Sequence, residues 1–135
     1  MFLFLKTVVF LDSCFSGRGD RSVVAEGTRP IGLSIKNPVI ASGRTVVISA
    51  AEGTQASSFY KESGHGLFTY FLLLGLKGEA DSDSDGWVDV EELFTYLKPN
   101  VSKLARRINR EQTPTIFPSA GSMDTLMELK LSKPD

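Results

Sequence analysis

Two short apolar runs restrict what this chain can fold into more than any other feature of its sequence. Residues 7–11 and 45–50 are rich in β-branched side chains, and neither run alternates apolar with polar residues. Such runs are typical of strands inside a parallel sheet, whose two faces are covered by helices. We therefore expect central strands over residues 6–14 and 44–50 and an α/β fold.

The apolar character of the first run extends back to Met1 and is interrupted by Lys6. A signal peptide carries its positive charge ahead of the apolar stretch, and a run of 11 residues is too short to span a bilayer. We expect a strand here and no membrane partner.

Helical periodicity begins after the second strand. Apolar residues recur at three- and four-residue steps and predict helices over about 66–77 and 89–109, the first of them ending at Gly78. Pro99 lies inside the second helix and should kink it or start a new one. Alternation over residues 127–131 predicts a half-exposed edge strand. The order of these elements favours helices packed on a mostly parallel sheet.

Composition excludes several classes of function. The 135 residues suit a single domain, and 15 basic against 16 acidic side chains give no electrostatic reason to expect a nucleic-acid partner. One cysteine excludes an internal disulfide, a cysteine-rich zinc site and an iron–sulfur cluster. A lone cysteine also fits a reducing compartment, so we expect a cytoplasmic protein.

That cysteine, Cys14, follows the first predicted strand in the segment Asp-Ser-Cys-Phe-Ser-Gly over residues 12–17. Ligands and catalytic groups gather at the carboxyl ends of strands in open α/β sheets, and Gly17 lets a substrate backbone come close. Burial as a small hydrophobic residue is nevertheless the commonest state of a free cysteine. Spacing alone leaves the catalytic and the structural interpretation open.

Residues 7–17 resemble the strand and nucleophile segment of the caspase-like cysteine peptidases, in particular the metacaspase and bacterial caspase-like branch. The resemblance continues in the family's order through residues 46–51, 55–57, 64–70 and 112–114. It implies a caspase-like (caspase-hemoglobinase) fold with a mostly parallel sheet and flanking helices. It also implies that Cys14 is the nucleophile of a peptide-bond hydrolase that uses no cofactor for catalysis.

The resemblance further implies a substrate site. Asp12 would line the pocket for the side chain before the cut bond, where a carboxylate favours Arg or Lys. Ser49 and Ala50 would pair with the main chain of a peptide or protein substrate as an added strand. The residues also allow simpler interpretations, in which Asp12 caps backbone amides and the other two end an ordinary strand.

The family's catalytic base has no counterpart here. In caspases a histidine lies about 50 residues upstream of the cysteine, but 13 residues precede Cys14. The single histidine, His65, matches a segment downstream of the nucleophile, and we expect it to form a hydrogen bond near a helix start. We expect a C-terminal part of a catalytic domain whose N-terminal strands are missing, with the missing half as a candidate partner.

The connection over residues 16–43 is polar and longer than most loops. It carries four basic residues that an Arg- or Lys-specific peptidase could cut: Arg18, Arg21, Arg29 and Lys36. The resemblance implies maturation by cleavage in this loop. The alternative is that the charges only solvate a surface segment.

Residues 81–92 fit the EF-hand loop pattern, which supplies hard oxygen ligands for Ca²⁺. The expected ligands are Asp81, Asp83, Asp85, Trp87 through its carbonyl, Asp89 and Glu92. The alternative is a solvated acidic turn whose aspartates cap the following helix. The sequence contains no second loop of this kind.

Three hypotheses follow for function. The first is a fragment of a caspase-like cysteine endopeptidase that cuts after Arg or Lys. The second is a catalytically inactive caspase-like scaffold or interaction module. The third is a calcium-binding domain in which Cys14 is incidental.

Overall fold

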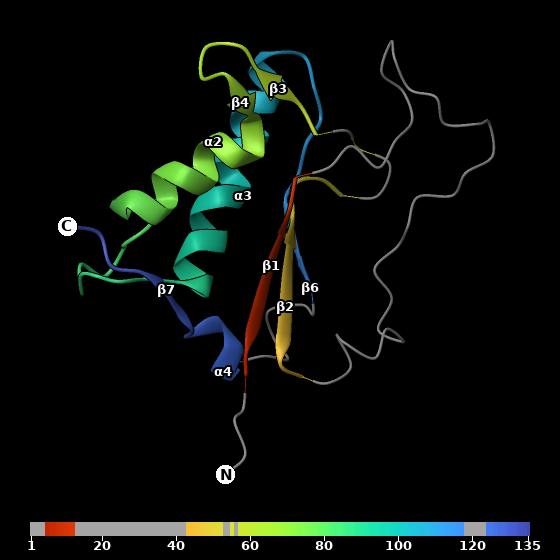
Figure 1. The fold of residues 1–135 in the computed structure, drawn as a ribbon. Coiled ribbons are helices and arrows are strands. Elements are labelled where there is room, and N and C mark those ends of the chain that lie inside the picture. Colours follow the sequence, from red (N-terminus) through yellow and green to blue (C-terminus); the bar gives the residue numbers. More distant parts are fainter. Residues whose placement is uncertain (1–4, 13–42, 53–54, 56, 118–123) are drawn as a thin grey trace.

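The computed structural model describes residues 5–12, 43–52, 55, 57–117 and 124–135. Over these residues the chain is a mixed α/β structure with small sheets and two main helices, which confirms the α/β class. Cys14 and all but the last residue of the 16–43 loop lie outside the described residues. Figure 1 shows the two main helices on one side of the largest sheet.

The largest sheet has the order β1-β2-β6, formed by Thr7–Leu11, Thr45–Ser49 and Thr115–Phe117. Strand β1 pairs with β2 in parallel, whereas β6 pairs with β2 in the antiparallel sense. The expectation of a mostly parallel sheet is therefore not met by the described strands. All five residues of β2 are buried, as its unbroken apolar run predicts.

Helix α2 spans Leu67–Leu74 and continues as a π-helical turn, η1, over Gly75–Glu79. The helical path breaks at Gly78, whose φ of 122° is readily adopted only by glycine. This confirms the predicted end of the first helix. Two short strands, β3 (Phe59–Tyr60) and β4 (His65–Gly66), form an antiparallel hairpin directly before α2.

Helix α3 spans Val90–Arg107 and corresponds to the helix predicted over 89–109. It runs through Pro99 as one helix, so the alternative of a new helix starting at this proline is wrong. Pro99 is exposed, and one turn earlier the carbonyl of Tyr96 accepts a 2.7 Å hydrogen bond from Asn100 Nδ2. The helix therefore accommodates the proline on its solvent side.

The C-terminal segment differs from the predicted edge strand over residues 127–131. Asp124–Met127 form a short helix, α4, and only Lys130–Ser132 form a strand, β7. Strand β7 pairs with β5 (Val88–Asp89) and not with the largest sheet. Met127 is buried in the core as part of the short helix α4, so its apolar character reflects packing of this helix and not the alternation of a strand.

The core lies between the sheet and the two main helices. A stripe of apolar side chains along one face of α3 fills much of it. Residues on this stripe at three- and four-residue spacing are fully buried, as helical periodicity requires: Val90, Leu93, Leu97, Val101 and Ala105. Val46, Ile48, Leu67 and Phe68 belong to the same cluster. Among the described residues no helix is both long and apolar enough to cross a membrane.

The buried face of α3 gives a first prediction. Replacing the fully buried Leu93 by Ala removes apolar contacts and leaves a cavity, so we expect the free energy of unfolding to fall by about 3 kcal/mol. Leu73→Ala, on α2 at a site 43% exposed, is the matched control and should cost about 0.5 kcal/mol. Urea titrations followed by circular dichroism measure both. Equal losses in the two variants would contradict this assignment of the core.

Candidate functional site

Parallel pairing of β1 and β2 brings three of the sequence-predicted site residues to one edge of the sheet. Leu11 lies opposite Ser49, and the Ala50 amide donates a 2.8 Å hydrogen bond to the Leu11 carbonyl. Asp12, the next residue after β1, therefore lies at the same edge as Ser49 and Ala50. Carboxyl ends of parallel strands are the usual place for ligand-binding groups in such sheets.

The Asp12 carboxylate is held by two hydroxyl groups from distant parts of the chain. Ser57 Oγ donates to Oδ1, and Thr69 Oγ1 donates to Oδ2 over 2.5 Å. A Cβ atom at Gly66 would collide with Oδ2, so a larger residue here would displace the carboxylate from its present position. The backbone amides that Asp12 would cap locally belong to the residues that follow it, which lie outside the described residues, so the capping interpretation stays open.

Asp12 is also exposed to solvent. Each carboxylate oxygen accepts one hydroxyl proton, and each retains lone-pair capacity for a further donor. The group is therefore fixed in orientation yet open to an incoming cation. A planar guanidinium can bind both oxygens of such a carboxylate, and an ammonium can bind one or both.

Ser49 and Ala50 are buried, and the backbone groups of Ala50 are already used within the protein. Its amide donates to Leu11, and its carbonyl accepts a 3.0 Å hydrogen bond from Gln112 Nε2. Gln112 is itself 2% exposed and accepts from the Ser58 amide through Oε1. A substrate strand added here would find only the second lone pair of the Ala50 carbonyl.

His65 lies beside this site on strand β4. It is exposed, and it precedes Gly66, the residue in contact with Asp12. The expected position at the entry to a helix is confirmed, because α2 begins at Leu67. The hydrogen bond near the helix start involves the His65 amide, which donates to Ser63 Oγ, and the imidazole bonds to no described residue.

The residues that sequence reasoning missed are the partners of Asp12. Ser57, Gly66 and Thr69 all lie in segments that carry the family resemblance, but no role could be given to them from spacing. They are separated from Asp12 by 45 to 57 positions, so no local pattern links them to it. Their membership of those segments was the only available signal.

A second cluster of functional groups occupies the predicted EF-hand loop. Carboxylate oxygens of Asp81, Asp83 and Asp85 lie within 4.8 Å of one another. Hydrogen bonds from loop amides fix all three: Gly86 donates to Asp81, Asp85 to Asp83, and Trp87 to Asp85. Asp81 Oδ1 is buried and has no hydrogen-bond partner, so it presents an unsatisfied acceptor of the kind a bound cation would satisfy.

Asp89 and Glu92, the other two predicted carboxylate ligands, are engaged with each other at the start of α3. Asp89 Oδ1 accepts from the Glu92 amide, and Glu92 Oε2 accepts from the Asp89 amide, which forms a capping box. Glu92 Oε1 also accepts from the amides of Ser82 and Asp83. The capping alternative therefore describes Asp89 and leaves the first three aspartates unexplained.

These contacts change the acidity of two carboxyl groups. Partial desolvation acts to raise the pKa of Glu92, but hydrogen bonds from Asp89, Asp83 and Ser82 outweigh it and lower that pKa. The hydrogen bond from the Asp85 amide acts to lower the pKa of Asp83. Desolvation and the charges of Asp85 and Glu92 outweigh that bond, so the pKa of Asp83 is raised. For Asp83, desolvation contributes most to the raised pKa, and repulsion from the neighbouring carboxylates adds to it.

The C-terminal strand closes over this loop. Val88 of β5 lies opposite Ser132 of β7, and Lys130 Nζ lies 3.7 Å from Asp85 Oδ2. The ammonium groups of Lys130 and Lys133 also lie 5.1 and 5.6 Å from the centre of the Trp87 ring. Both lysines thus place positive charge next to the acidic cluster.

Comparison of the chain with protein-family models, curated proteins and solved structures gives no match.

The contact between Gly66 and Asp12 gives a second prediction. Gly66 has φ −59° and ψ 147°, which alanine adopts freely, so any effect of Gly66→Ala comes from displacement of the carboxylate. We expect the variant to weaken the bond from Thr69, with a coupling energy to Asp12→Ala of about 1 kcal/mol in a double-mutant cycle. Thermal unfolding of the four proteins measures it. Additive effects would mean that Gly66 and Asp12 do not interact.

Proposed function

We propose that this chain is part of a caspase-like cysteine endopeptidase that hydrolyses peptide bonds after Arg or Lys. Cys14 is the nucleophile, and Asp12 receives the basic side chain before the cut bond. The observation that supports the proposal most is convergence: the segments around residues 12, 57 and 66–69 carry the family resemblance and meet at the Asp12 carboxylate.

The chemistry follows from the position of Asp12 two residues before Cys14. In the proposed reaction a basic residue bound through its side chain to Asp12 presents its own carbonyl carbon to the Cys14 thiolate. The thiolate attacks that carbonyl carbon, the amine leaves with a proton, and water then hydrolyses the thioester. Asp12 contributes binding and orientation, and its two hydroxyl donors hold it in place.

A general base must still be supplied, since the only histidine of the 135 residues is His65. We propose that the base comes from a polypeptide segment other than residues 1–135, namely the half of the domain that precedes the nucleophile in relatives. Among the described strands, β1 has β2 on one side and no neighbour on the other, so a further strand can pair there. The catalytically inactive scaffold remains the competing hypothesis.

The third prediction tests Cys14 and Asp12 without a catalytic base. At pH 8.5 about half of an ordinary thiol is ionised, so a peptide chloromethyl ketone ending in Arg should alkylate Cys14 with loss of chloride. We expect labelling to be faster than with the matching Leu compound. Because Asp12 is exposed, Asp12→Asn should lower the rate for the Arg compound by roughly several-fold and leave the Leu compound unchanged.

Intact-protein and peptide mass spectrometry measure these rates. Glu128→Gln, an exposed acidic residue outside the site, is the control and should behave like the unmodified chain. Equal rates for both compounds, or equal effects of Asp12→Asn on both, would reject the pocket and favour the inactive scaffold.

A second function, calcium binding by residues 81–92, is favoured by one specific observation. The buried, unpartnered Asp81 Oδ1 belongs to a group of three carboxylates held together by loop amides. We propose that Asp81, Asp83 and Asp85 hold Ca²⁺, with the Trp87 carbonyl, Asp89 and Glu92 completing the ligand set. Lys130, which contacts Asp85, competes with the cation for that carboxylate.

The fourth prediction separates a calcium site from a solvated turn. Calorimetry should detect Ca²⁺ binding to the unmodified chain and a loss of at least about tenfold in affinity for Asp83→Asn, which leaves the capping box intact. Lys130→Gln should raise the affinity a few-fold, whereas Lys133→Gln, which makes no ion pair with the loop, should change it less. Absence of heat in every variant would exclude the site.

A further inference from the structure

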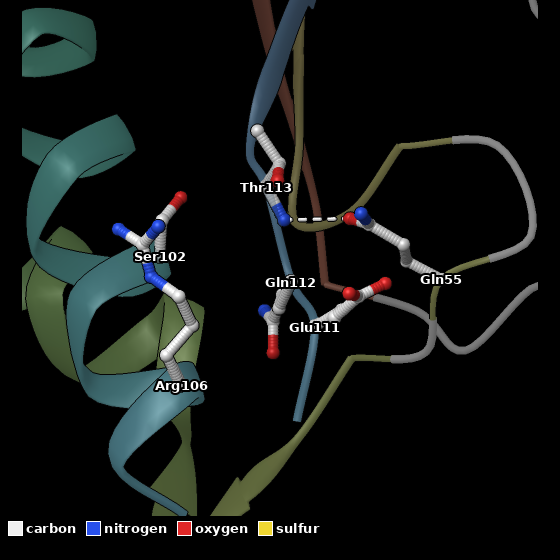
Figure 2. Close-up of a pocket in the computed structure, with 6 residues that line it drawn as sticks. All are labelled: Gln55, Ser102, Arg106, Glu111, Gln112 and Thr113. Carbon is white, nitrogen blue, oxygen red and sulfur yellow. Dashed lines mark hydrogen bonds between the residues drawn. The ribbon is translucent and has the colours of Figure 1, made fainter. Parts of the chain in front are cut away.

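Gln112 is a buried side chain that joins two parts of the chain near the candidate peptidase site. It is 2% exposed. Its Nε2 atom donates a 3.0 Å hydrogen bond to the Ala50 carbonyl, and its Oε1 atom accepts a 2.8 Å hydrogen bond from the Ser58 amide. Figure 2 shows Gln112 on the segment that leads into β6, beside Thr113, whose amide donates to Gln55 Oε1 over 2.7 Å. The two glutamines thus hold this segment against the chain that follows β2.

One of the two Gln112 bonds leads to the strand that carries Asp12. Ala50, whose carbonyl accepts from Gln112, donates its amide proton to the Leu11 carbonyl over 2.8 Å. Asp12 is the next residue after Leu11. Two hydrogen bonds in series therefore fix the position of the glutamine amide relative to the backbone of Asp12.

The other bond leads to the hydroxyl groups that hold the carboxylate. Ser57, the residue before Ser58, donates through Oγ to the Asp12 carboxylate. The Ser58 carbonyl accepts a 2.7 Å hydrogen bond from the amide of Leu67, the first residue of α2. Thr69 of this helix donates to the second carboxylate oxygen. Both hydroxyl donors are therefore placed by a segment that the glutamine holds at Ser58.

The contacts form a closed ring that starts and ends at Asp12 and passes through the Gln112 side chain. Without the glutamine amide, the Ser58 N–H and the Ala50 C=O lose these partners, and a polar group that loses its partner on burial is costly. The chain around Ser57 would then shift relative to β1. The Asp12 carboxylate would keep its charge but would no longer be held in one orientation.

Orientation matters differently for the two basic side chains that Asp12 is proposed to receive. A guanidinium is planar, and it binds both oxygens of a carboxylate only when the two groups lie in matching planes. An ammonium group is a compact charge with three rotatable donors, so it tolerates a carboxylate that turns. A fixed carboxylate therefore favours Arg, whereas a mobile one treats Arg and Lys alike.

We propose that Gln112 is a positioning residue for the Asp12 carboxylate and that it favours Arg over Lys before the cut bond. This inference rests on the proposed function, because it concerns which basic side chain Asp12 receives. Gln112 does not contact the substrate, since it is buried and acts through Ser58 and Ala50. Asp12 supplies the charge, and Gln112 supplies its orientation.

The experiment compares three peptide chloromethyl ketones that differ only in their last residue, which is Arg, Lys or Leu. They alkylate Cys14 of the full chain at pH 8.5, and intact-protein mass spectrometry gives each rate. The Arg and Lys compounds carry the same charge, so the ratio of their rates reports the orientation of the carboxylate, and the Lys-to-Leu ratio reports its charge. In the unmodified chain we expect the Arg compound to react about threefold faster than the Lys compound.

Variants of Gln112 test its role. Gln112→Met keeps the size of the buried side chain and removes both hydrogen bonds. We expect it to bring the Arg-to-Lys ratio close to one and to leave the Lys-to-Leu ratio unchanged. Gln112→Glu keeps the acceptor for Ser58 and loses the donor to Ala50. Its Arg-to-Lys ratio should therefore lie between that of Gln112→Met and that of the unmodified chain.

Two further sites supply controls. Leu93→Ala is the control for stability alone, because Leu93 is fully buried in the core and its side chain makes no hydrogen bond. It should lower the melting temperature and keep the unmodified Arg-to-Lys ratio. Ser57→Ala removes one hydroxyl donor of Asp12 directly and should lower the ratio, whereas Ser57→Thr keeps a hydroxyl and should retain it.

Circular dichroism shows which variants are folded under the labelling conditions. An unmodified Arg-to-Lys ratio in folded Gln112→Met would overturn the inference, and where that variant does not fold, the same result for Gln112→Glu would overturn it. An equal fall of the ratio in Leu93→Ala would mean that Gln112 acts through stability alone, which also overturns it. Failure of the proposed function has a different result, in which neither basic compound reacts faster than the Leu compound, and the inference then fails with it.

Discussion

Burial of strand β2 is the constraint on which the rest of the structure depends. Every residue of β2 is buried, and the strand pairs with β1 on one side and with β6 on the other. Its register with β1 sets where Asp12 emerges, and the carbonyl of Ala50, the residue after β2, accepts a hydrogen bond from Gln112. The Asp12 site and the Gln112 contact are therefore both positioned from the same strand.

The sequence predicted the elements that have long, regular apolar patterns, whereas it did not predict the short elements. The α3 stripe runs for several turns, and its five fully buried positions agree with the periodicity. Strand β6 has three residues and follows Pro114, so it has too few positions to show a pattern. The alternation over residues 127–131 predicted a strand that starts too early, because Met127 belongs to a short helix and reaches the core from there.

The candidate sites show the same limit. Acidic side chains at fixed spacing located the loop over residues 81–92, because all its groups are close in sequence. The partners of Asp12 are brought together only by the fold. Long-range contacts of this kind follow from tertiary packing and not from local propensity.

The surroundings of Trp87 have a consequence for spectroscopy. It is the only tryptophan of the chain, and it lies where β5 pairs with β7, with two lysine ammonium groups against its ring. Intrinsic indole emission therefore reports on whether the last residues stay docked, and says little about the distant three-stranded sheet. A fluorescence transition that precedes the loss of helical ellipticity would indicate local fraying of the C-terminus and not global unfolding of the domain.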